Sequence, residues 1–177
     1  MNNTIRLCCP CHFGLESVLK YEILKIGGTD LQVNDGKISF SGDESIIARA
    51  NICLSTAERV LIELAEFRAV TFEELFQGVK AIELERFIGK NDAFPVKGYS
   101  LKSKLFSVSD CQAIIKKAVV ERLKTKYGVS WFDETGPVHQ IQFSIMNDKA
   151  TLLIDTTGAG LHKRGYRLSQ NGAPIKE

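Results

Sequence analysis

The first 68 residues alternate between strand-like and helix-like hydrophobic patterns, in an order that few folds accommodate. Apolar side chains recur at helical spacing over residues 15–26 and 43–54. An Asp35-Gly36 pair predicts a tight turn, because glycine adopts positive φ without strain. Strands are expected where short apolar runs occur, at residues 7–11, 31–33, 37–40 and 59–67. The resulting order is β-α-β-β-α-β, and it is complete by residue 68.

This order is that of a ferredoxin-like domain, which we expect over residues 1–68. A second pattern begins at Thr71, where Thr71-Phe-Glu-Glu74 predicts a capping box at the start of a helix. The remaining elements are expected at residues 84–88 (short helix), 95–101 (strand), 109–127 (helix capped by Ser109) and 141–145 with 150–155 (hairpin). The sequence therefore predicts an α+β protein. Its second, α/β domain covers residues 69–157, and a Gly-rich basic linker follows over residues 158–177.

Positive charge is concentrated in the second half of the chain. Residues 1–90 carry 10 Lys/Arg and 13 Asp/Glu, whereas residues 91–177 carry 13 and 8. Residues 96–126 alone hold 8 basic and 2 acidic side chains. Such an asymmetry predicts a surface that binds a polyanion, and RNA is the partner we expect. A solvated helix face is the alternative interpretation.

Size and composition indicate where such a protein works. A length of 177 residues suits one large domain or two small ones. No apolar run is long enough to cross a bilayer, and the N-terminal residues lack the layout of a secretion signal. These features predict a cytoplasmic protein with no membrane partner. Its five cysteines, an odd number, are not expected to form a disulfide framework.

Two basic segments are the candidate RNA-binding sites. On the helix expected from Ser109, a spacing of about 100° per residue places Lys117 and Lys124 opposite the apolar face, with Lys116 to one side. The loop before it offers lysines and hydroxyls next to the positive end of the helix dipole. The segment at residues 161–167 adds a pliable basic patch with a tyrosine that can stack on a base. The complete candidate set is Lys102, Ser103, Lys104, Lys116, Lys117, Lys124, His162, Lys163, Arg164, Tyr166 and Arg167.

The run Cys8-Cys9-Pro10-Cys11-His12 has the residue types of a metal site but not the usual arrangement. A zinc site needs two spaced pairs of ligands, and no second pair follows here. Cysteine also packs well as a small apolar residue, so we expect structural cysteines and no metal. The sequence shows no dinucleotide loop, no phosphate loop and no recognisable group of catalytic side chains.

Several blocks of the sequence resemble the N-terminal part of the THUMP-domain RNA methyltransferases that modify the exocyclic N2 of guanosine in 23S rRNA. In the first half these are Cys-His-Phe-Gly-Leu-Glu-Ser-Val-Leu-Lys (11–20), Gly-Lys-Ile-Ser-Phe-Ser-Gly-Asp (36–43) and Ala-Asn-Ile-Cys-Leu-Ser-Thr-Ala-Glu-Arg-Val-Leu (50–61). Further blocks are Thr-Phe-Glu-Glu-Leu-Phe (71–76), Ser-Lys-Leu-Phe-Ser-Val-Ser-Asp-Cys-Gln (103–112) and Leu-His-Lys-Arg-Gly-Tyr-Arg (161–167). The resemblance implies a ferredoxin-like domain followed by a THUMP domain that binds structured RNA.

In that family the chain continues into a methyltransferase domain that binds S-adenosylmethionine and carries an Asn-Pro-Pro-Tyr-type motif. Residues 1–177 contain no such motif. The resemblance therefore implies an RNA-binding targeting module of an rRNA (guanine-N2-)-methyltransferase, without the catalytic domain or a cofactor of its own. Two alternatives stay open: a THUMP module of a thiouridine or pseudouridine synthase, and a cysteine-ligated metal or redox protein. The segment at 161–167 favours the methyltransferase.

Overall fold

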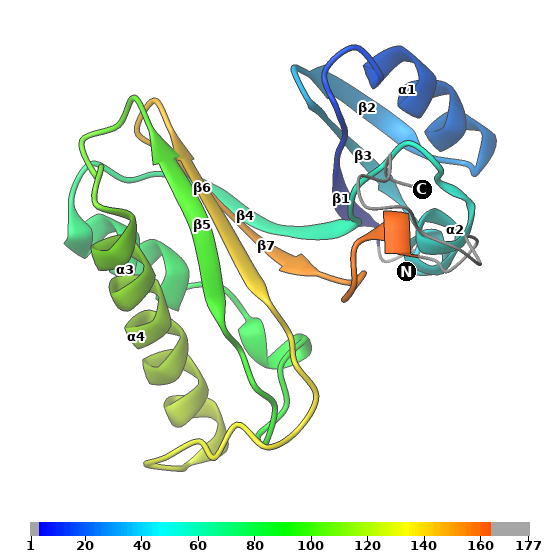
Figure 1. Ribbon diagram of the computed structural model, residues 1–177. Helices are drawn as coiled ribbons and strands as arrows, with labels where there is room; N and C mark the ends of the chain where they lie inside the picture. Colours follow the sequence, from blue (N-terminus) through cyan, green and yellow to red (C-terminus); the bar gives the residue numbers. More distant parts are fainter. Residues whose placement is uncertain (1–3, 164–177) are drawn as a thin grey trace, which may run out of the picture. The chain divides into compact units, whose positions relative to one another are not determined.

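The computed structural model describes residues 4–163 and divides into two compact units (Figure 1). The first unit comprises the chain up to Ile62 together with the segment that begins at Thr156, and the second comprises Glu63–Asp155. Strand β4 (Leu61–Arg68) crosses this division, because its first two residues pair within the first unit and its remainder lies in the second. From the sequence we expected the domain boundary at the end of this strand. A continuous strand gives no sequence signal for the point at which its pairing partner changes.

The first unit has the expected β-α-β-β-α-β order, which confirms the ferredoxin-like prediction. Strand β1 is paired antiparallel with both β3 and the start of β4, and the strand order is β2-β3-β1-β4. Helices α1 and α2 bury Leu19, Ile23, Ile46 and Ala50. The elements before β4 are β1 (Ile5–Pro10), α1 (Glu16–Lys25), β2 (Thr29–Asn34), β3 (Lys37–Gly42) and α2 (Ser45–Cys53).

The segment from Thr156 to Lys163 is part of the first unit, although its sequence predicted a linker without a core. The backbone N–H of Thr156 donates to the carbonyl of Val60 at 3.1 Å, and that of Leu161 donates to the carbonyl of Glu58 at 3.0 Å. Leu161 is buried and opens a short 3-10 helix, η2 (Leu161–Lys163). The many glycine and polar residues hid this role, because a single apolar side chain gives no periodic pattern.

The second unit is a sheet covered by two helices. Its strand order is β4-β7-β6-β5, with β6 antiparallel to β7 and parallel to the edge strand β5. Helices α3 and α4 pack together on one side of the sheet, with the short helix η1 next to α4 (Figure 1). Its remaining elements are α3 (Phe72–Lys80), η1 (Leu84–Arg86), β5 (Val96–Leu101), α4 (Val108–Tyr127), β6 (Ile141–Met146) and β7 (Lys149–Asp155).

The ends of α3 and α4 show which of the predicted capping residues are correct. The capping box at Thr71 is present, with the hydroxyl of Thr71 accepting from the N–H of Glu74 and the carboxylate of Glu74 accepting from the N–H of Thr71. The predicted cap at Ser109 is wrong, because Ser107 caps α4 by accepting from the N–H of Asp110 at 3.4 Å. Two serines two residues apart offer the same signal, and only the path of the preceding loop selects between them. Gly128 ends α4 at φ +63°, as expected for a glycine beyond a helix.

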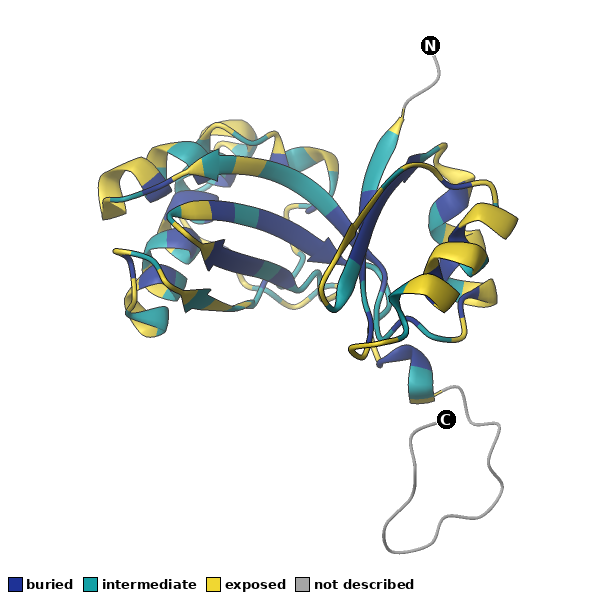
Figure 2. Ribbon diagram, turned by 90° about the horizontal axis from the view of Figure 1, so that it is seen from above, coloured by how far each residue is buried: buried dark blue, intermediate teal, exposed yellow. Residues whose placement is uncertain are grey.

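Burial differs between the strands of the second unit: consecutive residues are buried on β6 and on β7, whereas none is buried on β5 (Figure 2). The helix-covered side is lined by apolar residues of β6 and β7, among them Ile141, Phe143, Ile145 and Leu152. On β5 the exposed residues alternate with half-buried ones. Among residues 4–163, no helix is long and apolar enough to cross a membrane.

Replacing Leu161 by Ala is expected to destabilise the first unit by about 2–4 kcal/mol, because the change removes a buried side chain and leaves a cavity. Urea unfolding gives the stability change, and hydrogen exchange measured by mass spectrometry locates it in peptides from β1, β3 and β4. Leu24→Ala, at a position 52% exposed on α1, is the matched control and should cost far less. Equal effects of the two substitutions would contradict the assignment of this segment to the first unit.

Candidate nucleic-acid interface

The loop between β5 and α4 is held by a hydrogen-bonded clamp to the β6–β7 turn. The hydroxyl of Ser103 donates to the carbonyl of Leu101 at 2.9 Å and accepts from the N–H of Asp148 at 3.1 Å. The carboxylate of Asp148 in turn accepts from the N–H of Lys104 at 2.7 Å. Residue Lys102 adopts φ +49°, which turns the chain at the end of β5. Ser103 thus acts within the protein, as the residue that fixes the path of the loop.

The clamp leaves the side chains of Lys102 and Lys104 exposed. Within the part of the chain that the structure describes, neither ammonium has an ion-pair partner. Leu105 is buried and its carbonyl accepts from the hydroxyl of Ser100 at 2.5 Å, so the loop is anchored on both sides of Lys104. The arrangement presents two unpaired cations on a fixed backbone, which suits contacts to phosphates because little backbone conformational entropy is lost on binding.

The N-terminus of α4 is less suited to a phosphate than its sequence indicated. Ser107 already accepts from one free N–H of the first turn, and Asp110 places an exposed carboxylate there. A carboxylate at this position complements the helix dipole and repels an incoming anion. The lysine side chains of the loop, rather than the helix end, therefore provide the positive potential.

The outer face of α4 carries Lys117 and Lys124, as expected from the helical spacing. Lys124 Nζ lies 3.8 Å from the carboxylate of Glu121 one turn earlier. Lys117 Nζ lies 5.8 Å from the ring centre of Phe76 on α3, and Lys80 Nζ approaches the same ring at 5.7 Å. The packing of α3 on α4 therefore adds Lys80 to this basic surface. Sequence reasoning did not select Lys80, because the surroundings of this residue depend on how the two helices pack.

A second group of cations lies at the far end of α4, around a cavity of about 320 Å³. Arg122 makes two hydrogen bonds to Glu85 of η1, at 2.9 and 2.5 Å. These bonds hold the pKa of the Glu85 carboxyl below its ordinary value. The cavity is lined by Lys80, Glu85, Arg122, Thr125 and Lys126. Because Arg122 is neutralised by Glu85, Lys80 and Lys126 are the residues that make this cavity cationic.

Lys116 differs from the other candidate lysines because its ammonium is used inside the second unit. Its Nζ donates to the carboxylate of Glu134 at 2.6 Å and to the carbonyl of Phe94 at 3.1 Å, and lies 3.6 Å from the centre of the Phe94 ring. Burial favours the neutral acid form of Glu134, but the hydrogen bonds from Lys116 and from the Phe94 N–H outweigh it and lower the pKa of this carboxyl. The structure therefore shows Lys116 fastening the loop after α4 through Glu134.

The remaining candidates belong to the C-terminal segment. His162 and Lys163 lie in η2 of the first unit, where His162 is half-buried and Lys163 is exposed. Arg164, Tyr166 and Arg167 lie outside the described residues. The candidates are thus divided between the units, with the loop and helix lysines in the second and these two residues in the first.

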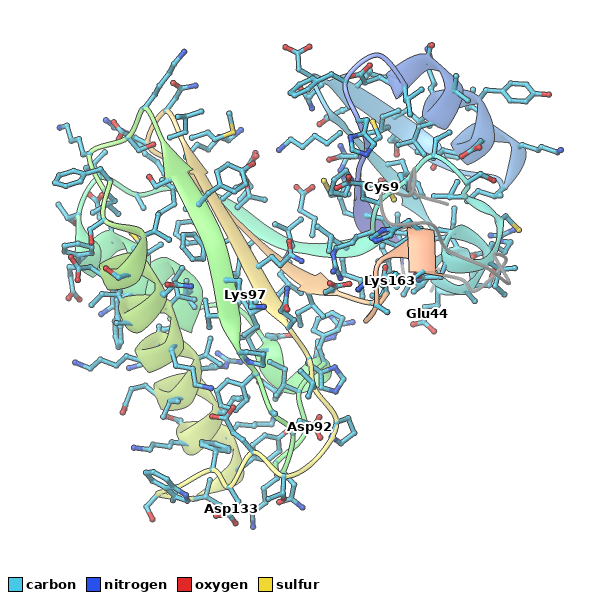
Figure 3. All side chains as sticks on the ribbon, viewed as in Figure 1. Cys9, Glu44, Asp92, Lys97, Asp133 and Lys163 are labelled. Atoms are coloured by element: carbon cyan, nitrogen blue, oxygen red, sulfur yellow. The ribbon has the colours of Figure 1, made fainter. Side chains whose placement is uncertain are left out.

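The cysteines of β1 and the residue after it are packed as apolar side chains. Cys8, Cys9 and Cys11 are all buried, and Figure 3 marks Cys9 within the first unit. Burial raises the pKa of the Cys9 thiol well above its ordinary value, which disfavours the reactive thiolate form. No group of three or more His, Cys, Asp or Glu side chains suited to a metal ion occurs between residues 4 and 163.

Comparison with known families identifies two domains in this chain. The family model of the RlmL ferredoxin-like domain matches residues 6–61, and that of the THUMP domain matches residues 69–155. These matches coincide with the two folded regions seen in the structure and confirm the resemblance inferred from the sequence. The intervening residues fall within β4.

Similar proteins are named as methyltransferases. The provisionally named RNA methyltransferase YpsC of Bacillus subtilis (strain 168) is 48% identical over 173 residues, which are 97% of this chain and 45% of YpsC. The ribosomal RNA large subunit methyltransferase K/L of Cellvibrio japonicus (strain Ueda107) is 28% identical over 94% of this chain and 22% of its own length. The chain thus spans less than half of these relatives.

Several solved structures share the fold of this chain. A predicted N6-adenine-specific DNA methylase from Listeria monocytogenes str. 4b F2365 has a TM-score of 0.92 and 47% identity, covering 98% of this chain and 46% of that one. SMU.472, provisionally assigned as a methyltransferase and complexed with SAH, has a TM-score of 0.88 and 40% identity over 96% of this chain and 46% of its own. A 4-thiouridine synthetase solved with RNA shares the fold alone, at 15% identity, a TM-score of 0.55, and coverage of 86% of this chain and 41% of its own.

Replacing Lys116 by Ala is expected to lower the stability of the second unit by about 1–3 kcal/mol at neutral pH, because it leaves the charge of Glu134 without its partner. Lys117→Ala, at the next position, should change stability by no more than about 0.5 kcal/mol. Urea unfolding of both variants provides the measurement.

The stability difference between wild type and Lys116→Ala should depend on pH. The pKa of Glu134 is lower in the folded state, so the pair stabilises the protein above the ordinary pKa of a glutamate and loses this effect as the pH falls through the lowered value. The difference between wild type and Lys116→Ala should therefore shrink in acid. A difference that stays constant as Glu134 is protonated would contradict the ion-pair role.

Proposed function

We propose that this chain is the RNA-binding targeting module of an RNA methyltransferase. Its two folded parts are an RlmL ferredoxin-like domain and a THUMP domain. One observation carries the proposal: the clamped β5–α4 loop of the THUMP domain presents Lys102 and Lys104 without ion-pair partners among the residues described. Lys117 and Lys80 extend the basic surface along the helices.

The more specific form of the proposal is a large-subunit ribosomal RNA guanine-N2 methyltransferase that acts on 23S rRNA in the cytoplasm. Support comes from relatives named as ribosomal RNA large subunit methyltransferase K/L and from the resemblance of the segment at 161–167 to that group. S-adenosylmethionine is the proposed methyl donor, since SMU.472 is complexed with SAH. Residues 1–177 contain no glycine-rich strand-turn-helix loop for such a cofactor. We therefore assign its binding to the part of the relatives that this chain does not cover.

The alternative proposal is that this THUMP domain belongs to a thiouridine or pseudouridine synthase. The match to the RlmL ferredoxin-like domain argues against it, because that domain accounts for the whole first unit up to β4. The likeness to the 4-thiouridine synthetase extends to the fold only. A preference for ribosomal RNA over transfer RNA in binding assays would separate the two.

RNA binding should depend on the loop lysines through contacts to phosphates. The double substitution Lys102→Ala with Lys104→Ala is expected to weaken binding to many RNAs alike, because phosphate contacts carry little sequence information. The slope of log K against log salt should decrease by roughly one for each phosphate that is no longer neutralised. Binding to a structured 23S rRNA fragment, measured across a salt series, tests both expectations.

The matched control replaces Lys20 and Lys25, two exposed lysines of α1 in the first unit. Neither pair should change stability appreciably, since exposed charges contribute little. A control pair that weakens binding as much as the loop pair would contradict the assignment of the loop, and a salt slope near zero would contradict binding through phosphates.

Residues 1–177 alone are expected to bind ribosomal RNA without methylating it, since we assign the cofactor site to a region beyond those residues. Incubation with labelled S-adenosylmethionine and ribosomal RNA should leave the RNA unlabelled, while the ribosomal RNA large subunit methyltransferase K/L of Cellvibrio japonicus, run in parallel, shows that the assay detects methylation. Incorporation of label by residues 1–177 would place catalytic residues in this chain and overturn the division of roles.

A further inference from the structure

The side of the second unit's sheet that faces away from α3 and α4 carries a small aromatic and aliphatic patch. Tyr99 and Leu101 on β5 are 49% and 52% exposed, and Met146 on β6 is 37% exposed. Leu101 is paired directly with Met146 in the parallel register of the two strands, and the Tyr99 hydroxyl lies 3.8 Å from Met146 Sδ. The three side chains are therefore contiguous, and the Tyr99 ring extends along the sheet toward β6.

This patch faces away from the helices of its own unit. Side chains alternate along a strand, and the alternate residues Ile141, Phe143 and Ile145 of β6 belong to the core beneath α3 and α4. Tyr99 is paired with Ser144 and Ser144 with the half-buried Thr151, so small polar side chains lie beside the ring on the neighbouring strands. Ser144 itself is only 6% exposed, so the surface that a flat molecule can contact is the outer face of the Tyr99 ring.

The rim of the patch is cationic. Lys97 lies two residues before Tyr99 on the same strand and is exposed (Figure 3), and Lys102 follows Leu101 directly. The carboxylates on this side are engaged: Glu66 lies 2.5 Å from Lys149, and Asp155 accepts from Gln142 at 3.3 Å. Among the residues that the structure describes, Lys97 and Lys102 have no acidic partner. An aromatic ring between two such lysines favours a ligand that combines a flat ring with negative charge.

We propose that this side of the sheet binds an unpaired nucleotide of the RNA, with its base stacked on Tyr99 and adjacent phosphates held by Lys97 and Lys102. The proposal rests on the RNA-binding function inferred above and specifies that the RNA includes a single-stranded element. Bases in a duplex are stacked on one another and cannot reach a protein ring, whereas bases in loops and ends can. A protein partner fits less well, because three half-exposed side chains are far fewer than the roughly 20–30 residues per side of a standard interface.

The test compares Tyr99→Ala with Tyr99→Phe in the chain of 177 residues. A single-stranded RNA oligonucleotide containing 2-aminopurine and a blunt duplex of the same length are the probes. Tyr99→Ala is expected to weaken single-strand binding roughly ten-fold and to abolish the quenching of 2-aminopurine on binding. Its salt slope should stay that of wild type, because stacking releases no counterions. Tyr99→Phe keeps the ring and should bind and quench as wild type does.

Tyr21→Ala is the matched control, since Tyr21 is also an exposed tyrosine, 68% exposed on α1 of the first unit. It should leave binding and quenching unchanged, and duplex binding should be equal for all variants. Circular dichroism and thermal unfolding confirm that each variant is folded. If wild type binds no RNA, the proposed function itself falls. If wild type binds RNA and Tyr99→Ala binds and quenches like it, only the stacking site is overturned and the patch is left to a protein partner.

Discussion

Parallel pairing of β5 with β6 is the constraint on which the second unit depends. Parallel neighbours cannot be joined by a tight turn, so the chain must cross over the sheet between them, and α4 is that crossover. The crossover places the β5–α4 loop at one end of the sheet and the loop after α4 at the other. The basic loop, the outer lysines of α4 and the Lys116 ion pair therefore occupy different places on one rigid frame. Tyr99, Leu101 and Met146 are exposed because both helices lie on the opposite side of the sheet.

The lysines of this unit separate into two groups for an energetic reason. A cation that is partly withdrawn from water must be compensated, and Lys116 is compensated by Glu134, the carbonyl of Phe94 and the Phe94 ring. Lys102 and Lys104 stay in water, where a cation is stable alone and remains available to a phosphate. The same distinction separates Arg122, which is paired with Glu85, from Lys126 at the rim of the same cavity.

The exposure of the candidate side chains was predicted in part, and their role in binding RNA stays a prediction. Lys102, Lys104, Lys117 and Lys124 are exposed or half-exposed where the pattern put them, because loop position and helical spacing are local properties. Ser103 and Lys116 have structural partners that lie far from them in sequence, Asp148 and Glu134. Hydrophobic periodicity cannot predict contacts between residues so far apart in the sequence. Lys80 and Tyr99 could not be selected from the sequence for the same reason. The surroundings of Lys80 depend on how α3 packs on α4, and the exposure of Tyr99 depends on which side of the sheet the helices cover.

By itself, the sequence determined the order of the elements, the ferredoxin-like and THUMP assignment, the capping box at Thr71 and the excess of positive charge in the second half. The THUMP assignment came from the resemblance of several sequence blocks to a known family. The other features follow from hydrophobic period, turn residues and composition, which act over a few neighbouring residues. Tertiary structure alone decided that Ser107 rather than Ser109 caps α4, that residues 156–163 return to the first unit, and that Lys116 turns inward. Each of these outcomes depends on pairing between segments distant in the chain, where the free energy of burial and hydrogen bonding selects one partner among several that local patterns allow.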